Sequence, residues 1–405
     1  MNAALLGGFL MAITTAGWQP PEGVFPILGW VKPQTTLAGY QQWADDGFTM
    51  ASECGEEDMK LAAEVGRSAF YYLGTPDPAT PDGKAKIDAA IEICSRYPNC
   101  LGYFLTDEPG TAAFPLLGRV VAYLREHDPK RLAFINLLPT YANEQQLGAK
   151  TYREHVERYI AEVKPEVVCY DNYPCVGPDD WRGDYYLNME LVREISAKAG
   201  LPFWNFALST GHYGYRVPTK ADLALQAFSD LAYGARGVFY FTYGHVNAEG
   251  FGQAIMDAEG RPTPTYELVR RLNPVVRAWG LWLAESLAVC HVGEVPEGAR
   301  PLEAGDPDQA VVACEPGNCI IATMRAKSGA LAVMVVNKDR HHEQAFRLRF
   351  REGIEKAAEV KAPGAVAEAK GPKAEVAAAQ DVSEGMTVRV AAGFAKLYEV
   401  SGRGR

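Results

Sequence analysis

The sequence predicts a (β/α)8 barrel followed by a small all-β domain. Between residues 25 and 280, eight short apolar segments alternate with eight longer segments whose apolar residues have helical spacing. Eight strand–helix units within about 250 residues match the size of such a barrel. Beyond residue 287 the helical spacing stops, and short apolar segments separated by turns continue toward the end of the chain. This second pattern is typical of a β-sandwich.

The expected barrel strands are brief, apolar and rich in Val, Ile, Phe or Tyr, as are strands buried on both faces of a parallel sheet. They are Phe25–Trp30, Gly47–Ser52, Ala69–Gly74, Gly102–Leu105, Ala133–Leu138, Val167–Tyr170, Phe203–Ala207 and Gly237–Phe241. The expected helices are Thr36–Asp45, Glu56–Val65, Asp82–Tyr97, Thr111–His127, Thr151–Val163, Tyr186–Ala199, Thr219–Tyr233 and Thr263–Trp279. Asp82 and Thr219 are candidate N-caps. Helices are expected to end at Gly66, Gly200 and Gly280.

An open, doubly wound sheet is the alternative arrangement of the same elements. That fold often carries a glycine-rich phosphate loop after its first strand. Here the first strand is followed by Val31–Thr35, which reads Val-Lys-Pro-Gln-Thr and contains no glycine. The barrel is therefore favoured.

The C-terminal part is expected to contain eight short strands. They are Cys290–Val292, Ala310–Cys314, Cys319–Met324, Leu331–Asn337, Gln344–Phe350, Ala358–Lys361, Met386–Val390 and Ala395–Val400. Residues 357–379 are rich in Ala, Lys and Glu, but prolines and glycines at 363, 364, 371 and 372 interrupt them, which predicts strands and loops instead of a helix. The expected division is an apolar N-terminal segment (1–22), the barrel (23–284), the β-sandwich (285–402) and a tail (403–405).

The charge of the chain excludes some classes of partner. Its 405 residues carry a net charge of −10, and lysine and arginine occur in no run longer than short pairs. Nucleic-acid and anionic-membrane partners require a basic patch, so neither is expected. No C-x-x-C motif occurs, and a chain of this size needs no structural metal. We expect no cofactor and no metal, and the oligomeric state is not predicted.

The N-terminus suggests export from the cytoplasm. An apolar run, Ala3–Ala12, precedes the first charged residue, Glu22. The run is too short to span a bilayer and resembles the hydrophobic part of a signal peptide, although no basic residues precede it. A secreted or periplasmic protein is expected; the alternative is a cytoplasmic one whose N-terminal segment is buried or frayed.

Two pairs of cysteines lie close together in the sequence. Cys94 and Cys100 form one pair, and Cys314 and Cys319 form the other. Either pair could close a short disulfide loop in an oxidising compartment. The alternative is a set of scattered, buried thiols.

Polar and aromatic residues cluster at the expected C-terminal ends of the strands, where barrel enzymes hold their reacting groups. Sugar recognition needs this mixture, because aromatic faces pack on the C–H face of a pyranose while amides and carboxylates bind its hydroxyls. The expected substrate-binding residues are Trp30, Glu53, Asp107, Asn136, Tyr173, Trp204, Asn205, His212, Tyr240 and Tyr243. For the aromatic residues the alternative is core packing, and Asn136 could instead belong to a polar layer inside the barrel.

Glu108 is the expected catalytic acid. Pro109 disfavours the α region for Glu108, so we expect an extended residue whose side chain stands at the end of strand four. Glycoside hydrolysis requires a carboxylic acid that protonates the leaving oxygen. Crowding by aromatic residues and by Asp107 would raise the pKa of Glu108. The alternative is an acid at a helix start that complements the helix dipole.

The second catalytic carboxylate is expected to be Asp171. The segment Tyr170–Pro174 repeats the arrangement of a strand end followed by a proline. Glu53, Asp107, Glu249 or no second carboxylate at all are the alternatives.

Five segments carry a resemblance to a known group of enzymes. They are Gly102–Pro109, Phe134–Asn136, Tyr170–Pro174, Phe203–Phe206 and Ala232–Tyr243. Over residues 25–280 the chain resembles the clan A glycoside hydrolases, and more closely β-galactosidase-like barrel proteins of bacterial polysaccharide degradation. The resemblance implies an acid/base glutamate at the end of strand four, at the position of Glu108. It also implies a nucleophilic glutamate at the end of strand seven, where residues 203–209 contain no carboxylate.

The leading hypothesis is a glycoside hydrolase acting on an oligo- or polysaccharide. Glu108 would be the general acid/base and Asp171 the nucleophile or base. The alternative is a non-catalytic carbohydrate-binding protein on a degenerate barrel, which the missing carboxylate of strand seven favours. A metal-dependent barrel hydrolase would need histidine-rich strand ends, whereas the adjacent pair His341 and His342 falls in the β domain.

Overall fold

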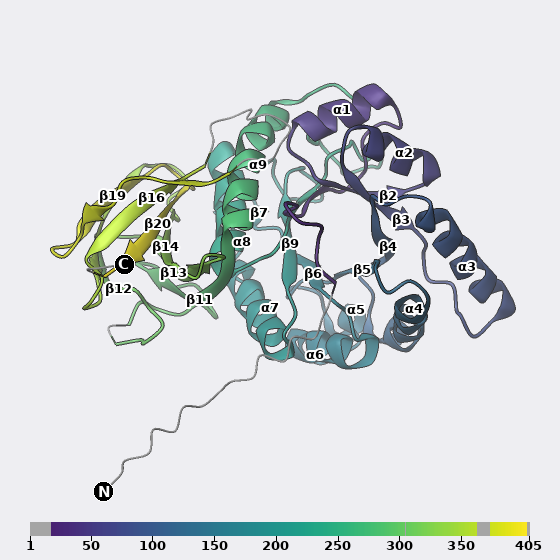
Figure 1. Ribbon diagram of the computed structural model, residues 1–405, viewed down its shortest axis with the longest axis horizontal. Coiled ribbons are helices and arrows are strands. Elements are labelled where there is room, and N and C mark those ends of the chain that lie inside the picture. The colour runs from purple at the N-terminus through teal and green to yellow at the C-terminus, as the bar shows by residue number, and fades with distance from the viewer. Residues whose placement is uncertain (1–17, 304, 363–372, 403–405) are drawn as a thin grey trace, which may run out of the picture.

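The structure is a computed structural model that describes residues 18–303, 305–362 and 373–402. Within them, eight parallel strands close into a barrel surrounded by helices, beside a domain of antiparallel sheets (Figure 1). The strand order around the barrel is β1-β10-β9-β6-β5-β4-β3-β2. The predicted fold class is confirmed. The apolar run at the N-terminus, residues 363–372 and the tail 403–405 lie outside the described residues.

All eight predicted barrel strands are present, with small differences at their ends. They are β1 (Ile27–Gly29), β2 (Met50–Cys54), β3 (Ser68–Tyr72), β4 (Cys100–Asp107), β5 (Leu132–Leu137), β6 (Val168–Asp171), β9 (Phe203–Leu208) and β10 (Val238–Phe241). A short hairpin, β7 (Cys175–Val176) with β8 (Asp180–Trp181), follows β6. This hairpin was not predicted.

The helices agree equally well with the sequence. They are α1 (Leu37–Asp45), α2 (Glu56–Glu64), α3 (Pro81–Ser95), α4 (Phe114–His127), α6 (Tyr152–Val163), α7 (Tyr185–Ala199), α8 (Lys220–Tyr233) and α9 (Pro264–Trp282), with the short η1 (Thr111–Ala113) and α5 (Glu144–Leu147). Thr219 is the N-cap of α8, as predicted. Asp82 is not a cap, because Thr80 precedes α3 and accepts from the N–H of Gly83.

Gly280 does not end its helix, contrary to expectation. The helix α9 continues to Trp282, and Gly280 lies inside it. A Cβ atom added at this position would lie 2.3 Å from Cε2 of Phe25. Glycine is therefore needed for close packing against Phe25 and not for a left-handed terminus.

Large side chains fill the interior of the barrel. Because side chains alternate along a strand, every second residue points inward. The inward cluster includes Leu28, Met50, Phe70, Phe104, Phe134, Cys169, Trp204, Phe206 and Phe239. Trp18 packs edge-on against Trp204, with their ring centroids 5.8 Å apart. This packing fills the middle of the barrel with side chains.

The β domain begins directly after α9. Its strands are β11 (Leu283–Val292), β12 (Val311–Glu315), β13 (Cys319–Ala326), β14 (Leu331–Asn337), β15 (Gln344–Phe350), β16 (Lys356–Lys361), β17 (Glu375–Val376), β18 (Gln380–Asp381), β19 (Met386–Val390) and β20 (Ala395–Ser401). A seven-stranded and a three-stranded antiparallel sheet share one apolar core. All eight cysteines of the chain are buried and unbonded; the sulfur atoms of Cys314 and Cys319 lie 3.6 Å apart.

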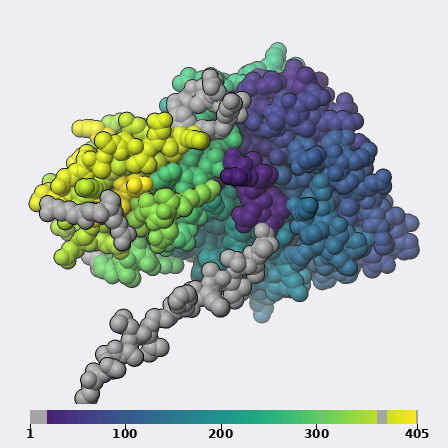
Figure 2. All heavy atoms as spheres, viewed as in Figure 1, coloured from purple at the N-terminus to yellow at the C-terminus, as the bar shows by residue number. Residues whose placement is uncertain are grey.

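The outer face of the larger sheet packs on the barrel helices. Residues of β13, β14 and β20 share the barrel's outer core with α8 and α9. The indole N–H of Trp279 donates to the carbonyl of Val360 (3.1 Å), and Tyr233 hydrogen-bonds His291 (2.9 Å). Figure 2 shows the two parts in direct contact. Among the described residues, no helix combines the length and apolarity that a membrane span requires.

The packing of Gly280 can be tested by substitution. We expect Gly280→Ala to lower the free energy of unfolding by about 1–3 kcal/mol, because overpacking against Phe25 outweighs the better helix propensity of alanine. Thermal unfolding measures the change. Gly183→Ala is the control, since a Cβ there meets nothing within 4 Å. Equal melting temperatures for both variants would contradict this account of α9.

Candidate active site

A cavity of about 210 Å³ opens at the C-terminal ends of the barrel strands. Its walls are formed by Trp30, Asp107, Glu108, Asn136, Tyr141, Asp171, Tyr173, Phe206, His212, Tyr213, Tyr215, Phe241 and Phe251. Larger cavities, of about 850 and 630 Å³, lie against the β domain and beside the N-terminal ends of the strands. The smaller one is the candidate site, because it alone among these three is lined by several convergent carboxyl groups.

Asn136 lies between two of these carboxyl groups. Its Nδ2 donates to Oδ1 of Asp107 (3.0 Å) and to Oδ1 of Asp171 (2.9 Å). The three residues come from adjacent strands β4, β5 and β6, so one amide spans the two carboxylates on either side of it. The other amide atom, Oδ1 of Asn136, is buried without a hydrogen-bond partner in the described part of the chain. It is free to accept from a ligand hydroxyl.

A β-bulge directs Asp107 into the cavity. Phe104 pairs with Phe134, but Asp107 pairs with Asn136, so three steps along β4 match two steps along β5. Without the extra residue, Asp107 would share the outward orientation of Leu105, which packs in the outer core. Bulges often re-aim a side chain next to an active site.

The backbone of Glu108 is left-handed, with a φ of +46°. The prediction of an extended residue is therefore wrong, although the side chain does line the cavity. Pro109 disfavours the right-handed α region, and the Glu108 N–H is fixed by the carbonyl of Asn136 (2.9 Å). Val31, Glu53 and Tyr213, which follow or end other barrel strands, are also left-handed. Such costly conformations concentrate at functional sites.

The surroundings of the carboxyl groups raise their pKa values. Asp107 and Glu108 are reached by solvent through the cavity, yet protein surrounds them on the other sides. Loss of hydration raises the pKa of Glu108 to about 7, and the charge of Asp107 adds to this. Burial, followed by the charges of Glu108 and Asp107, raises the pKa of Asp171 well above its ordinary value. The two carboxyl groups influence each other's ionisation, because the charge of Glu108 also raises the pKa of Asp171.

Aromatic rings form the remaining walls. Tyr173 stacks on Phe241 with centroids 5.2 Å apart, and His212 stacks on Phe251 at the same separation. Nδ1 of His212 lies 3.0 Å from the carbonyl of Thr210, which assigns the ring proton to Nδ1. Burial lowers the pKa of His212. A neutral ring therefore leaves Nε2 as a hydrogen-bond acceptor.

Five of the expected binding residues, Glu53 among them, do not line the cavity. Trp204 points inward but lies deeper in the barrel, against Trp18 and Phe239, and Phe206 takes its place in the wall. Asn205 points outward and donates to Oδ1 of Asp230 (2.6 Å). Tyr240 and Tyr243 also point outward, where both pack against Phe48. The expectation failed because neighbouring strand residues face opposite sides.

The other expected residues keep their place. Trp30, Asp107, Asn136, Tyr173 and His212 line the cavity beside Glu108 and Asp171. Glu53 is not part of the wall. Burial raises the pKa of Glu53, and the charge of Asp107 raises it further. Glu249 is exposed. The sequence analysis did not single out Tyr141, Phe206, Phe241 or Phe251. Phe206 and Phe241 lie on strands, and the alternation of side chains along those strands, counted from Trp204 and Tyr240, could have found them.

A family comparison covers part of the barrel. Residues 119–279, from within α4 to within α9, match the family model described as Beta-galactosidase, and this stretch begins after Asp107 and Glu108. The resemblance stated from the sequence is thus confirmed, and the match supports a glycosidase as the class of enzyme. No curated protein matches the sequence.

Solved glycosidases have similar chain traces. A β-galactosidase from the psychrophilic Marinomonas ef1 is 10% identical, with a TM-score of 0.46 over 62% of this chain and 59% of that one. The alignment thus spans less than two thirds of that enzyme. An α-L-arabinofuranosidase from Thermotoga maritima is 11% identical, with a TM-score of 0.48 over 90% and 89%. The GH51 arabinofuranosidase from Xanthomonas axonopodis pv. citri is 11% identical, with a TM-score of 0.46 over 95% and 97%.

The raised pKa of Asp171 predicts a pH dependence of stability. In the folded protein Asp171 keeps its proton at pH values where the unfolded chain has lost it, so the free energy of unfolding falls as the pH rises above about 4. Asp171→Asn removes this loss. We expect the variant to gain about 2–4 °C in melting temperature over the native protein between pH 4 and pH 8. Asp88→Asn is the control, because the pKa of Asp88 is lowered. Parallel curves for native protein and Asp171→Asn would contradict the assignment.

Proposed function

We propose that the protein is a glycoside hydrolase that cleaves a glycosidic bond in an oligo- or polysaccharide, with Glu108 as the general acid. The observation that carries the proposal is the convergence of Glu108, Asp107 and Asp171 in an aromatic-walled cavity, where burial and the charge of Asp107 raise the pKa of Glu108 to about 7. A carboxylic acid with a raised pKa at the end of barrel strand four is the group that protonates a leaving oxygen.

The cavity supports a simple sequence of events. A sugar ring packs against the aromatic walls, and Asn136 accepts a hydroxyl hydrogen bond through its unpaired Oδ1. Glu108 transfers its proton to the glycosidic oxygen as the C–O bond breaks. The positive charge that develops on the sugar is stabilised by Asp107, which Asn136 holds in the same cluster.

Asp171 is the proposed partner that attacks the anomeric carbon or deprotonates water. Carboxyl groups of retaining enzymes lie about 5 Å apart, and those of inverting enzymes about 6.5–9.5 Å apart. Glu108 and Asp171 line the same cavity of about 210 Å³, and each appears among the electrostatic neighbours of the other. The anomeric configuration of the first product, followed by NMR, distinguishes retention from inversion.

A second function is favoured by one observation. The strand β9 ends in Leu208, followed by Ser209 and Thr210, so no carboxylate stands where clan A enzymes place their nucleophile. This favours a carbohydrate-binding protein that no longer hydrolyses its ligand. The two functions differ in the effect of substituting Glu108.

The acid role of Glu108 predicts a defined loss of activity. We expect Glu108→Gln to lower kcat on nitrophenyl glycosides by about 10²–10⁴-fold, because glutamine cannot donate the proton. The loss should shrink on a dinitrophenyl glycoside, whose leaving group needs little protonation. A panel of aryl glycosides and polysaccharides measures both effects. Glu259→Gln, an exposed site in the loop after β10, is the control and should match the native rate. Turnover that survives equally in Glu108→Gln would show that another group donates the proton, whereas sugar binding without turnover in the native protein would favour the binding function.

The same role predicts the pH profile. The reaction requires a protonated Glu108, so kcat/KM should fall as the pH rises above about 7. In Glu108→Gln this alkaline limb should disappear, leaving a low rate that is flat over the same range. A limb of unchanged position in the variant would show that another group carries the proton.

A further inference from the structure

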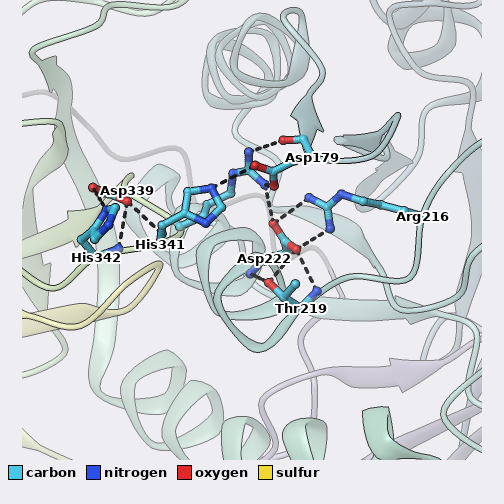
Figure 3. A network of polar contacts seen from close by, with 8 residues as sticks. Asp179, Arg216, Thr219, Asp222, Asp339, His341 and His342 are labelled. Carbon is cyan, nitrogen blue, oxygen red and sulfur yellow. Dashed lines mark hydrogen bonds and ion pairs between the residues drawn. The ribbon is translucent and has the colours of Figure 1, made fainter.

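We propose that Arg340, a residue of the β domain, is a positioning residue for the active-site cavity, because it joins two barrel loops that form one wall. The first is the rim loop, residues 209–219, which follows β9 and carries His212 and Tyr215. The second is the hairpin loop, residues 172–184, which follows β6 and contains β7 and β8. Figure 3 shows the contacts that connect them.

The rim loop is held by a buried carboxylate. The guanidinium of Arg216 donates to both oxygens of Asp222, at 2.6 and 3.0 Å. Asp222 lies in the first turn of α8, its side chain is 0% exposed, and it also accepts from the backbone N–H and the hydroxyl of Thr219. Arg216 therefore fixes the end of the rim loop to the start of a helix.

Arg340 reaches the same carboxylate from the β domain. It follows β14, and its Nη1 donates to Oδ1 of Asp222 (3.0 Å). Only 13% of its side chain is exposed. Burial opposes ionisation of Asp222, yet the hydrogen bonds from Arg216, Thr219 and Arg340 lower its pKa to about 2. Asp222 thus stays charged between its two arginine partners at any pH near neutrality.

The other contacts of Arg340 hold the hairpin loop. Its Nη1 donates to Oδ1 of Asp179 (3.0 Å) and its Nη2 to the carbonyl of Asp179 (2.6 Å). Nε2 of His341 lies 3.1 Å from Oδ2 of Asp179. The guanidinium also lies over the ring of Trp181, 5.4 Å from its centroid. The planar guanidinium presents its N–H donors in a fixed fork that spans both loops, whereas a lysine ammonium is a compact point charge.

The hairpin loop in turn touches the cavity wall. Nη2 of Arg182 donates to the hydroxyl of Tyr215 (3.1 Å), and its guanidinium lies 4.1 Å from the ring centroid of Tyr141. The two loops also meet through their backbones, since the N–H of Arg216 donates to the carbonyl of Cys175 (3.1 Å). Both tyrosines line the cavity. Holding the loops together therefore fixes the position of this wall.

Hydrogen–deuterium exchange tests the inference without a known substrate. We expect Arg340→Ala to accelerate amide exchange on the order of 10-fold in residues 175–182 and 211–217, where the lost charge-assisted hydrogen bonds end. The parallel strands β2 and β3 should keep their native rates. Arg325→Ala is the matched control, because Arg325 forms an exposed ion pair with Glu285 elsewhere in the β domain. Unchanged exchange in both loops would overturn the proposal.

Two more variants cover the case in which Arg340→Ala unfolds and exchange rises everywhere. Asp179→Ala cuts only the hairpin side, and Arg340→Lys keeps the charge near Asp222 but not the double contact. We expect faster exchange in 175–182 for both variants, with α8 unchanged. Native rates in both would refute the bridging role.

If a substrate is found, Arg340→Ala should raise KM several-fold and Arg340→Lys should recover part of the lost affinity. This kinetic result depends on the proposed function, whereas the exchange result does not.

Discussion

The amide of Asn136 is the contact on which the active-site arrangement depends. Two carboxyl groups, Asp107 and Asp171, face each other across β5 where hydration is restricted, and like charges there repel strongly. One nitrogen that donates to both offsets part of this repulsion. Burial and the neighbouring carboxyl charges also raise the pKa values of Glu108 and Asp171. Charge compensation by Asn136 and the raised pKa values thus arise from the same crowding of carboxyl groups.

The barrel meets this requirement by departing from regular geometry. A bulge in β4 turns Asp107 inward, and the next residue takes a left-handed backbone that directs Glu108 to the same cavity. A regular strand would place only one of two neighbouring residues inside. Two adjacent carboxyl groups can therefore share a cavity only where the strand is interrupted. The strain at Glu108 is tolerated because Pro109 and the hydrogen bond to Asn136 leave it few alternatives.

Apolar runs and helical spacing were sufficient to predict the barrel and its order of elements, because burial imposes these patterns on any sequence with this fold. They could not predict the bulge, which depends on pairing between β4 and β5, nor the depth of Trp204, which depends on how far β9 extends into the barrel. Asn205 and Tyr240 were assigned to the wrong face of their strands, because an error of one residue places a side chain on the opposite face. Gly280 has the appearance of a helix stop in the sequence, and only its contact with Phe25 explains it.

The β domain is coupled to the cavity through α8. The outer face of this helix joins the core shared with β13, β14 and β20, while its first turn holds Asp222 beneath the rim loop. One helix thus links a large apolar interface to a small polar one. The apolar interface supplies the rigidity, because a packed core deforms little. Arg340 connects this rigid interface to the loops after β6 and β9, which have few strand contacts of their own. The accessory domain is best understood as the outer support of one active-site wall, with Asp222 as the point where both parts of the chain meet.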